Sequence, residues 1–418
     1  MTALAACVIA GLIAAACGAG GAPTTSGPSK AATTSPTGSP SSSASETGGP
    51  IVLGALEGPI AEGGPDFANG MQLAVKLINT SGGVGGRPLE LKIFQSSGTV
   101  EDYVAAYKEA AADPSIAGVF HAGVTGALAI RAQSDSVALP FITASGNDAI
   151  DRPPVKYVFK NSPAHEGTTS SLTYAVKNFG AKSVAAIYYG TDYSVQIPDA
   201  LENRCAELGC QVVALENAAA DAPVDALTPQ LTKMRAANPD VYYIEGLNPS
   251  AFAAARQLGL DKPIISETWL AIPALRDACG QNCHGVTFAI HKCNVPELLA
   301  PTDPLKGLCE EYRTAYEAEF GSWAGFSIYG RDAVYALAAA ARRVVDAGQS
   351  LTRETLASSL EQFDGELTTT AGTLRTAPDN HRLSGQWSEG YIDVVIKVAA
   401  DKSTWVLAPN ADVAGSTP

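Results

Sequence analysis

Hydrophobic residues in the first part of the chain follow two alternating periodicities. Short apolar runs typical of buried strands are separated by segments in which apolar residues recur at helical spacing, as in Met71, Ala74, Val75 and Ile78. Strands are predicted at 51–56, 89–94, 116–121 and 139–144, and helices at 66–79, 100–113 and 125–137. This alternation predicts an α/β fold with a parallel, doubly wound sheet.

A second series with the same pattern begins after "DRPP" at 151–154. Its strands are predicted at 156–161, 183–190, 210–216, 240–246 and 263–266, and its helices at 168–179, 195–208, 225–236 and 249–258. Two Rossmann-like lobes in tandem are therefore expected. Because ligands of open α/β sheets bind outside the carboxyl ends of the strands, a cleft between the lobes is the expected site.

The C-terminal part of the chain has a different pattern. Helices are predicted at 304–320, 325–348 and 352–362, and a strand hairpin at 391–409. We expect these elements to complete the two sheets.

The N-terminal 17 residues, "MTALAACVIAGLIAAAC", have the layout of an export signal. They are shorter than the roughly 20 apolar residues that span a bilayer. "LIAAAC" followed by Gly18 resembles a bacterial lipobox, so we expect Cys17 to be lipidated and 1–17 to be a lipoprotein signal peptide. An ordinary cleaved signal and a box that ends at Cys7 remain alternatives.

Residues 18–49 are rich in Gly, Ser, Thr and Pro, a composition that buries little apolar surface. They are predicted to form a disordered, solvated tether with a reach of roughly 30 Å. Lipid, tether and globule together indicate a receptor or enzyme anchored at the outer surface of the cell membrane.

The size and charge of the chain limit its function. Its 418 residues are enough for two ordinary domains, because single cores rarely grow beyond about 250 to 300 residues. The 28 basic and 42 acidic residues give a net charge of −14, which repels phosphate backbones and anionic headgroups. The balance argues against nucleic acid as a partner.

Six cysteines follow the predicted signal. The simplest pairing in an oxidising compartment is Cys205 with Cys210, Cys279 with Cys283, and Cys293 with Cys309. A zinc site is the alternative, with ligands drawn from Cys279, Cys283, His284, His291 and Cys293. Disulfides are favoured and no metal is predicted, because the C-x3-C spacing is unusual for zinc and exported thiols tend to oxidise.

Motifs for catalysis or cofactor binding were not found in the sequence. It has no G-x-S-x-G elbow, no H-E-x-x-H, no P-loop and no G-x-G-x-x-G between a strand and a helix. We therefore predict no enzymatic activity and no cofactor.

Small polar residues follow two neighbouring predicted strands. Thr125 comes after 116–121, and Ser145, Gly146 and Asn147 come after 139–144. Hydroxyls and free backbone N–H groups at such strand ends are suited to a carboxylate. Alternatively, Thr125 caps a helix while Ser145 and Asn147 form a turn. Asp148 has no assigned role.

Several segments resemble the type I periplasmic-binding-protein family, specifically the branched-chain amino-acid (Leu/Ile/Val) receptor branch of ABC importers. The resemblance runs from about Pro50 to the C-terminus. Its most specific part is "GPIAEGG" at 58–64, with the Asn69–Gly70 helix start and the "GGVGGRPL" turn at 82–89. "LPFITASGND", "YYGTDYSVQ" and "YGRDAVYALAAA" support it.

The resemblance implies a ligand site and a division into lobes. Thr125, Ser145 and Asn147 would hold a ligand carboxylate, with Gly146 allowing close backbone approach. Tyr193 would cover the ligand from the other lobe and Glu267 would take an α-amino group. The family's three interlobe crossovers imply one lobe from 50–163 and 292–366, and a second from 164–291 and 367–418.

Three positions depart from the family pattern. His121 and Ala122 replace a Gly-Pro pair, Glu57 stands before Gly58 in place of a small polar residue, and Ser194 replaces a Gly after Tyr193. Glu57 and His121 are at strand ends, so they are candidates to contact extra polar or cationic groups of a ligand; an incidental surface position is the alternative for both.

We expect a lipid-anchored, extracytoplasmic solute-binding protein, monomeric, that presents a small polar molecule to an ABC permease. An amino acid or related carboxylate is the expected ligand, with amides, aromatic acids and polyamines as alternatives. A ligand-sensing module for a signalling partner is the main alternative function, and an enzyme is the third.

Overall fold

The computed structural model describes residues 48–59, 64–163, 165–384, 393–398 and 405–409. The predicted signal at 1–17, its Cys17 and nearly all of the tether at 18–49 lie outside these residues. Within the described part, no helix combines the length and hydrophobicity needed to cross a membrane.

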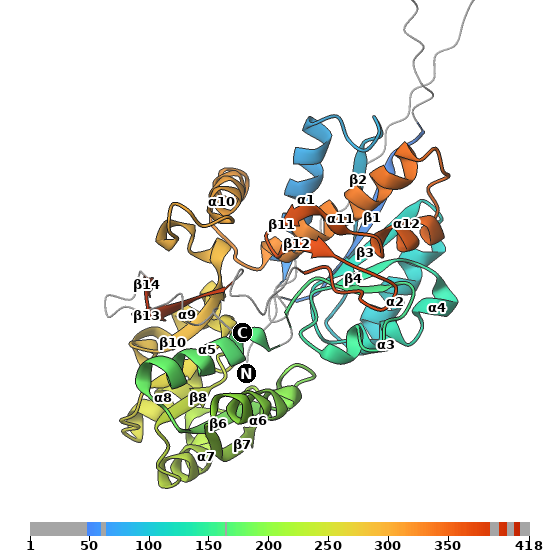
Figure 1. Cartoon of the computed structure of the whole chain (residues 1–418). Helices are drawn as coiled ribbons and strands as arrows, with labels where there is room; N and C mark the ends of the chain where they lie inside the picture. The colour runs from blue at the N-terminus through green and yellow to red at the C-terminus, as the bar shows by residue number, and fades with distance from the viewer. Residues whose placement is uncertain (1–47, 60–63, 164, 385–392, 399–404, 410–418) are drawn as a thin grey trace, which may run out of the picture. The chain divides into compact units, whose positions relative to one another are not determined.

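The first lobe is built on a parallel sheet with strand order β2-β1-β3-β4-β5 (Figure 1). Its strands are β1 (Ile51–Glu57), β2 (Leu89–Gln95), β3 (Ile116–His121), β4 (Phe141–Thr143) and β5 (Val158–Lys160). The helices between them are α1 (Pro65–Thr80), α2 (Val100–Ala112), α3 (Ala127–Arg131) and α4 (Ser134–Val137). The single helix predicted at 125–137 is thus two short ones.

Alternate side chains of these strands enter two different hydrophobic cores. On β1, Ile51, Leu53 and Ala55 pack with α1 and with the late helices α11 (Ser327–Asp346) and α12 (Arg353–Leu360). Val52 and Leu56 face the opposite way, toward α2 and α3. This period of two buries both faces of β1, which explains why that strand is almost continuously apolar.

Two glycines bring α1 and α11 into close contact. A Cβ atom on Gly70 would lie 2.0 Å from the backbone oxygen of Ser327, and one on Gly330 would lie 2.0 Å from that of Phe67. Only glycine therefore allows this approach. It places Phe67 beside the start of α11.

The second lobe is built on a sheet with strand order β14-β13-β10-β9-β8-β6-β7. Strands β6 (Ser183–Tyr189), β7 (Gln211–Ala218), β8 (Val241–Ile244), β9 (Ile264–Ser266) and β10 (Thr287–His291) are parallel. The helices are α5 (Glu166–Tyr174), continued as a π-helix over Ala175–Phe179, then α6 (Ile197–Leu208), α7 (Val224–Ala236), α8 (Ser250–Gln257) and α9 (Pro273–Cys279).

The C-terminal elements are divided between the two lobes. β13 (Asp393–Val398) pairs antiparallel with β10, and β14 (Trp405–Leu407) pairs with β13, so the predicted hairpin extends the second sheet. An unpredicted hairpin of β11 (Asp364–Thr369) and β12 (Gly372–Arg375) precedes them. Strand β10 and helix α9 were also missed.

The lobe boundary expected at 366/367 falls inside strand β11, so it would divide the hairpin of β11 and β12 between the two lobes. Leu374 and Leu383, beyond that boundary, are buried in the core of the first lobe. The chain segment at Arg382 also pairs with Lys160 at the edge of the first sheet. These contacts associate the chain with the first lobe as far as residue 383.

All three predicted disulfides are present: Cys205–Cys210, Cys279–Cys283 and Cys293–Cys309, with Cα–Cα distances of 4.5, 5.7 and 4.6 Å. The first closes the end of α6, and the third ties the chain after β10 to α10 (Lys306–Phe320). The predicted pairing is confirmed. Because Cys279, Cys283 and Cys293 are all in disulfides, they have no free thiolates to bind the zinc of the alternative interpretation. Among the described residues, no group of three or more His, Cys, Asp or Glu is arranged to hold a metal.

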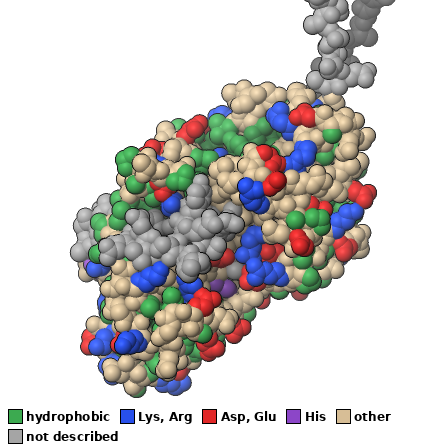
Figure 2. All heavy atoms as spheres, viewed as in Figure 1, with side chains coloured by type: hydrophobic (Ala, Val, Ile, Leu, Met, Phe, Trp, Pro, Cys, Tyr) green, Lys and Arg blue, Asp and Glu red, His purple; other side chains and the backbone are tan. Residues whose placement is uncertain are grey.

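Charged side chains do not form a single basic patch on the face shown in Figure 2. There, Lys and Arg lie interspersed with Asp and Glu. The pattern is that of an ordinary solvated surface.

Candidate ligand site

A cavity of about 160 Å³ lies at the carboxyl ends of strands from both sheets. Segments after β3, β4 and β5 line it from the first lobe, and segments after β6, β8 and β9 line it from the second. The lining residues are Phe67, Ala122, Gly123, Val124, Thr125, Ala144, Gly146, Ser162, Pro163, Thr191, Tyr193, Leu247, Thr268, Trp269, Ile272, Phe326 and Tyr329. The cleft expected at the strand ends is therefore present as a pocket between the two lobes.

Aromatic side chains form much of the cavity wall. Trp269 of the second lobe stacks on Phe326, with ring centroids 6.0 Å apart and an interplanar angle of 18°. Phe67 of α1 stacks on Tyr329 of α11 at 6.3 Å. The close packing of α1 on α11 through Gly70 and Gly330 thus also fixes one wall of the cavity. Such walls are suited to an apolar or aromatic group.

Thr125 lines the cavity but does not cap a helix. Helix α3 begins at Ala127 and its N-cap is Gly126, in the left-handed conformation with φ 79°. The carbonyl of Thr125 accepts a hydrogen bond of 2.8 Å from Nε2 of His121. Thr125 therefore does not cap the helix, and it is one of the residues that line the cavity.

Ser145 and Asn147 are engaged in local turn contacts. The hydroxyl of Ser145 accepts a bond from the backbone N–H of Asn147, and the side chain of Asn147 caps the 3-10 helix Asp148–Ile150 by accepting from the N–H of Ala149. Ser145 and Asn147 are buried but do not line the cavity, whereas Gly146 between them does. The turn alternative therefore describes these two side chains.

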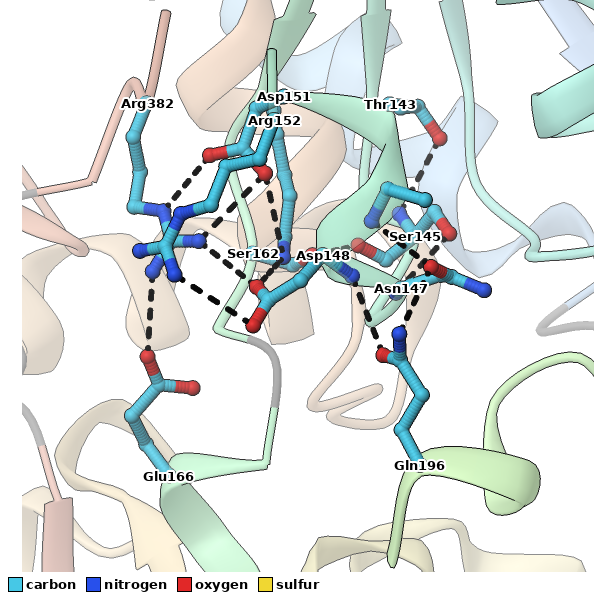
Figure 3. A network of polar contacts seen from close by, with 12 residues as sticks. Thr143, Ser145, Asn147, Asp148, Asp151, Arg152, Ser162, Glu166, Gln196 and Arg382 are labelled. Atoms are coloured by element: carbon cyan, nitrogen blue, oxygen red, sulfur yellow. Dashed lines mark hydrogen bonds and ion pairs between the residues drawn. The ribbon is translucent and has the colours of Figure 1, made fainter. Parts of the chain in front are cut away.

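Asn147 and Asp148 also contact the second lobe, as Figure 3 shows. The Asn147 amide donates to the carbonyl of Asp192 at 3.1 Å, and the Gln196 amide donates to Oδ1 of Asn147 at 3.2 Å. The backbone N–H of Asp148 donates to Oε1 of Gln196 at 3.2 Å. We call these contacts, with the ion pair of Arg382 and Glu166 at 3.4 Å, the interlobe clasp.

Asp148 belongs to a buried ion network beside the clasp. Its carboxylate lies 3.1 Å from Nζ of Lys160, which is fully buried, and 2.9 Å from Arg382. Arg382 also binds Asp151 at 3.0 Å. Burial alone would raise the pKa of Asp148, but the charges of Lys160 and Arg382 outweigh it and lower that pKa below its usual value. The role of Asp148 is therefore electrostatic and structural.

In the second lobe, Tyr193 covers a buried carboxylate. The Tyr193 hydroxyl donates to Oε2 of Glu267 at 3.1 Å, and the tyrosine ring lines the cavity. Oε1 of Glu267 makes no hydrogen bond within the described chain. Burial, and then the neighbouring Glu245, raise the pKa of Glu267 well above its usual value, although N–H groups of Gly246 and Thr268 oppose the shift.

Glu245 is a second buried acid, which sequence reasoning missed. Its Oε1 accepts a bond of 2.6 Å from Ser194, and its Oε2 accepts one of 3.0 Å from the N–H of Tyr189. Burial raises the pKa of Glu245 to about 8. The signal was available in "VYYIEG", where a charged residue directly follows a fully apolar strand. Ser194, one of the departures from the family pattern, is thus a partner of this acid.

Glu57 and His121 do not line the cavity. The Glu57 side chain accepts a bond from Gln95 at 3.2 Å on the surface. His121 is fully buried and packs between Tyr103 and Phe141, with ring centroids 4.2 and 6.2 Å away. Both residues are at strand ends, as expected, but Glu57 lies on the surface and His121 lies in the core, so neither side chain faces the cavity.

Comparison with known proteins identifies the family. A family model described as periplasmic binding protein matches residues 52–392. The chain belongs to this family. Membership confirms the type I fold expected from the sequence and implies a solute-binding receptor outside the cytoplasm, in agreement with the three disulfides.

Relatives of this periplasmic binding protein include two whose names refer to Leu, Ile and Val. It is 25% identical to Leu/Ile/Val-binding protein homolog 3 of Brucella melitensis over 57% of this chain and 65% of that protein. It is 26% identical to a Leu/Ile/Val-binding protein of Rhizobium johnstonii over 50% of this chain and 56% of that protein. The matches thus span less than two thirds of either relative.

A solved structure shares the fold of this periplasmic binding protein. An extracellular ligand-binding receptor from Rhodopseudomonas palustris HaA2 superimposes with a TM-score of 0.73, over 86% of this chain and 99% of that one. Their sequences are 18% identical, so this likeness concerns the fold.

Proposed function

We propose that this protein is a lipid-anchored solute-binding protein of an ABC importer, without enzymatic activity, and that it binds an α-amino acid with an apolar side chain. The observation that carries the proposal is the cavity itself, because its aromatic walls include Tyr193, whose hydroxyl donates to the buried carboxyl group of Glu267 behind it. The names of the Brucella and Rhizobium relatives support the same ligand class.

The ligand is oriented by the polar groups around the cavity. Its ammonium group lies toward Glu267, beneath Tyr193, and its carboxylate lies toward the Thr125 hydroxyl and the backbone at Gly146. Its side chain packs against Trp269 and Phe326. Ser145 and Asn147 shape the turn that presents Gly146, and Glu57 and His121 have no part in binding.

The chain acts as a monomer tethered through Cys17, and it passes its ligand to a permease in the cytoplasmic membrane. Mass spectrometry of the protein isolated from its native membrane tests the anchor. A diacylated or triacylated N-terminal Cys17 is expected, whereas an unmodified N-terminus would contradict lipidation.

Isothermal titration of the purified protein tests the ligand class. L-leucine, L-isoleucine, L-valine and L-phenylalanine are compared with 4-methylpentanoate, which is leucine without its ammonium group, and with spermidine. Binding by one or more amino acids, and weaker or no binding by the other two compounds, is expected. Preference for 4-methylpentanoate or spermidine would replace the proposal with an organic-acid or polyamine receptor.

A further inference from the structure

Two of the five aromatic residues that line the cavity keep part of their surface accessible. Trp269 and Phe326 are only partly buried. The exposed fractions of Phe67, Tyr193 and Tyr329 are 5%, 8% and 7%. Because a ligand can contact only accessible surface, Trp269 and Phe326 offer it more than the other three aromatic residues do.

Trp269 is positioned by packing. It lies in the 3-10 helix Thr268–Ala271, which follows β9. A Cβ atom on Gly246 would lie 3.2 Å from that of Trp269, so this glycine allows the loop after β8 to pack closely against the helix. The indole N–H is buried and has no hydrogen-bond partner within the described chain. Ring contacts therefore orient the indole, including the edge-on ring of Tyr193 at 5.6 Å and 88°.

Phe326 is held at the start of α11 by the turn that precedes the helix. A Cβ atom on Gly325 would overlap Oδ1 of Asn294, and the same oxygen accepts a hydrogen bond of 3.1 Å from Nε1 of Trp323. Only glycine permits this approach of the turn to Asn294. Phe326 is thus a fixed part of the wall in the first lobe.

The rings of Trp269 and Phe326 come from different lobes and stack where the lobes meet, at 6.0 Å and 18°. Opening of the cleft separates them, so closure must restore or replace this contact. Aromatic pairs are stabilised beyond the burial of their area, because the edge and the face of a ring carry opposite partial charges. A ligand with an aromatic ring can offer such contacts to both residues, whereas an aliphatic side chain offers burial alone.

The rest of the wall limits the charge and size of the ligand's side chain. Among the described residues that line the cavity, none is Lys, Arg, His, Asp or Glu. A charged side chain would therefore lack a partner there. An apolar cavity of about 150 Å³ is large enough to take up benzene. A volume of about 160 Å³ thus favours one ring over the two fused rings of an indole.

We propose that Trp269 and Phe326 form a ring-selective subsite, and that the protein prefers an α-amino acid with a single aromatic ring, such as L-phenylalanine, to an aliphatic one of similar size. The inference rests on the proposed function and narrows its ligand class. On closure, the ligand's ring packs against the accessible surfaces of both side chains and replaces part of their contact with each other. Trp269 and Phe326 are therefore the specificity-determining residues.

Isothermal titration of the complete protein with a matched pair of ligands tests the subsite. L-phenylalanine and β-cyclohexyl-L-alanine have the same α-amino-acid group and a six-membered ring, but only the first ring is aromatic. L-phenylalanine should bind at least about 10-fold more tightly, as expected from two aromatic contacts, and also more tightly than L-leucine and L-tryptophan.

Each other outcome of these titrations contradicts a defined claim. Equal affinities for the matched pair, or tighter binding of β-cyclohexyl-L-alanine or L-leucine, would overturn this inference and leave the proposed function intact. Tighter binding of L-tryptophan would overturn the restriction to a single ring. Failure of every amino acid to bind would overturn the proposed function and this inference with it.

Two substitutions test the assigned residues. Trp269→Leu and Phe326→Leu each keep an apolar side chain but remove one ring. In each variant, the ratio of the affinities for L-phenylalanine and β-cyclohexyl-L-alanine should fall by about 3- to 10-fold. Phe179→Leu, at an exposed position outside the cavity, is the matched control and should keep the wild-type ratio. A wild-type ratio in both cavity variants, folded by circular dichroism, would overturn the assignment.

Nuclear magnetic resonance of the wild-type complex tests the contact without any variant. Nuclear Overhauser effects are expected between the ring protons of bound L-phenylalanine and the indole of Trp269. The control is Trp323, whose ring packs against Tyr312 and Tyr316 and should show none. Absence of the effect at Trp269 in the saturated complex would show that the ligand's ring lies elsewhere and would overturn the inference.

Discussion

The Tyr193 hydroxyl is one of few partners of a fully buried carboxyl group, to which it donates at 3.1 Å. Tyr193→Phe removes that donor but keeps the ring in the cavity wall. Because the substitution leaves a buried acceptor without its partner, we expect the free energy of unfolding to fall by about 1 to 3 kcal/mol. Urea denaturation measures the change. Tyr188→Phe, at a partly exposed position of β6, is the control, and equal stability of the two variants would contradict the prediction.

Glu245 makes stability depend on pH, because its pKa is raised from 4.5 to about 8 in the folded protein. Between these values the folded protein keeps a proton that the unfolded chain has lost. The free energy of unfolding therefore decreases as pH rises through this window. Urea denaturation of the ligand-free protein from pH 5 to 8.5 should show a decrease on the order of a few kcal/mol, and Glu245→Gln should flatten the curve. A wild-type stability that rises with pH across the whole window, with no difference from the variant, would contradict the assignment.

At the scale of elements, the contact of α1 with α11 determines where one aromatic wall of the cavity lies. Gly70→Ala would place a methyl group 2.0 Å from the backbone oxygen of Ser327, so the helices must separate. We expect a loss of stability of about 1 to 3 kcal/mol, because backbone atoms cannot yield as side chains do. Weaker ligand binding should accompany it, since Phe67 and Tyr329 move with their helices.

Gly307→Ala in α10 is the matched control for Gly70→Ala. No atom lies within 4 Å of the position of its Cβ, so alanine should be neutral or stabilise the protein by up to about 1 kcal/mol through its higher helix propensity. Thermal and urea unfolding of both variants provide the comparison. If Gly70→Ala proves as stable as Gly307→Ala, the close approach of α1 and α11 is not a structural requirement.

At the scale of the whole molecule, the interlobe clasp links closure to residues outside the cavity. Gln196→Ala removes two hydrogen bonds, to Oδ1 of Asn147 and from the N–H of Asp148. Closure should become less favourable by about 1 to 2 kcal/mol, which is roughly a 5- to 30-fold loss of affinity. The ligand-free variant should also populate an open form, because ligand binding and closure are coupled.

Small-angle X-ray scattering and calorimetry with L-leucine test the clasp. A larger radius of gyration is expected for ligand-free Gln196→Ala than for the wild type, and saturation with ligand should remove the difference. Gln211→Ala, exposed at the start of β7, is the control. Unchanged scattering and affinity would show that the clasp contributes nothing to closure.

Much of the fold was predictable because each element carries a local signal. Most of the strands from β1 to β9 are short apolar runs, and the major helices follow an apolar period of about 3.6, so both signals depend only on which faces are buried. The errors occurred where that signal is short or mixed. Helix α9 and the hairpin of β11 and β12 are short, and "TFAIH", which forms β10, lies within a cysteine-rich segment that also suggested a metal site.

The sequence by itself determined the family, the tandem α/β lobes, the disulfide pairing and the strand ends at which the site lies, because these follow from local patterns and short-range spacing. Only the tertiary structure decided which side chains face the cavity. Of the predicted site residues, Thr125, Gly146 and Tyr193 do so, and the others do not: Ser145, Asn147, Glu267, Glu57 and His121. The register of β8 and β9 brings Glu245 beside Glu267, and the approach of the lobes brings Gln196 to Asn147. Such contacts join residues from 22 to 49 positions apart, and local periodicity carries no information about them.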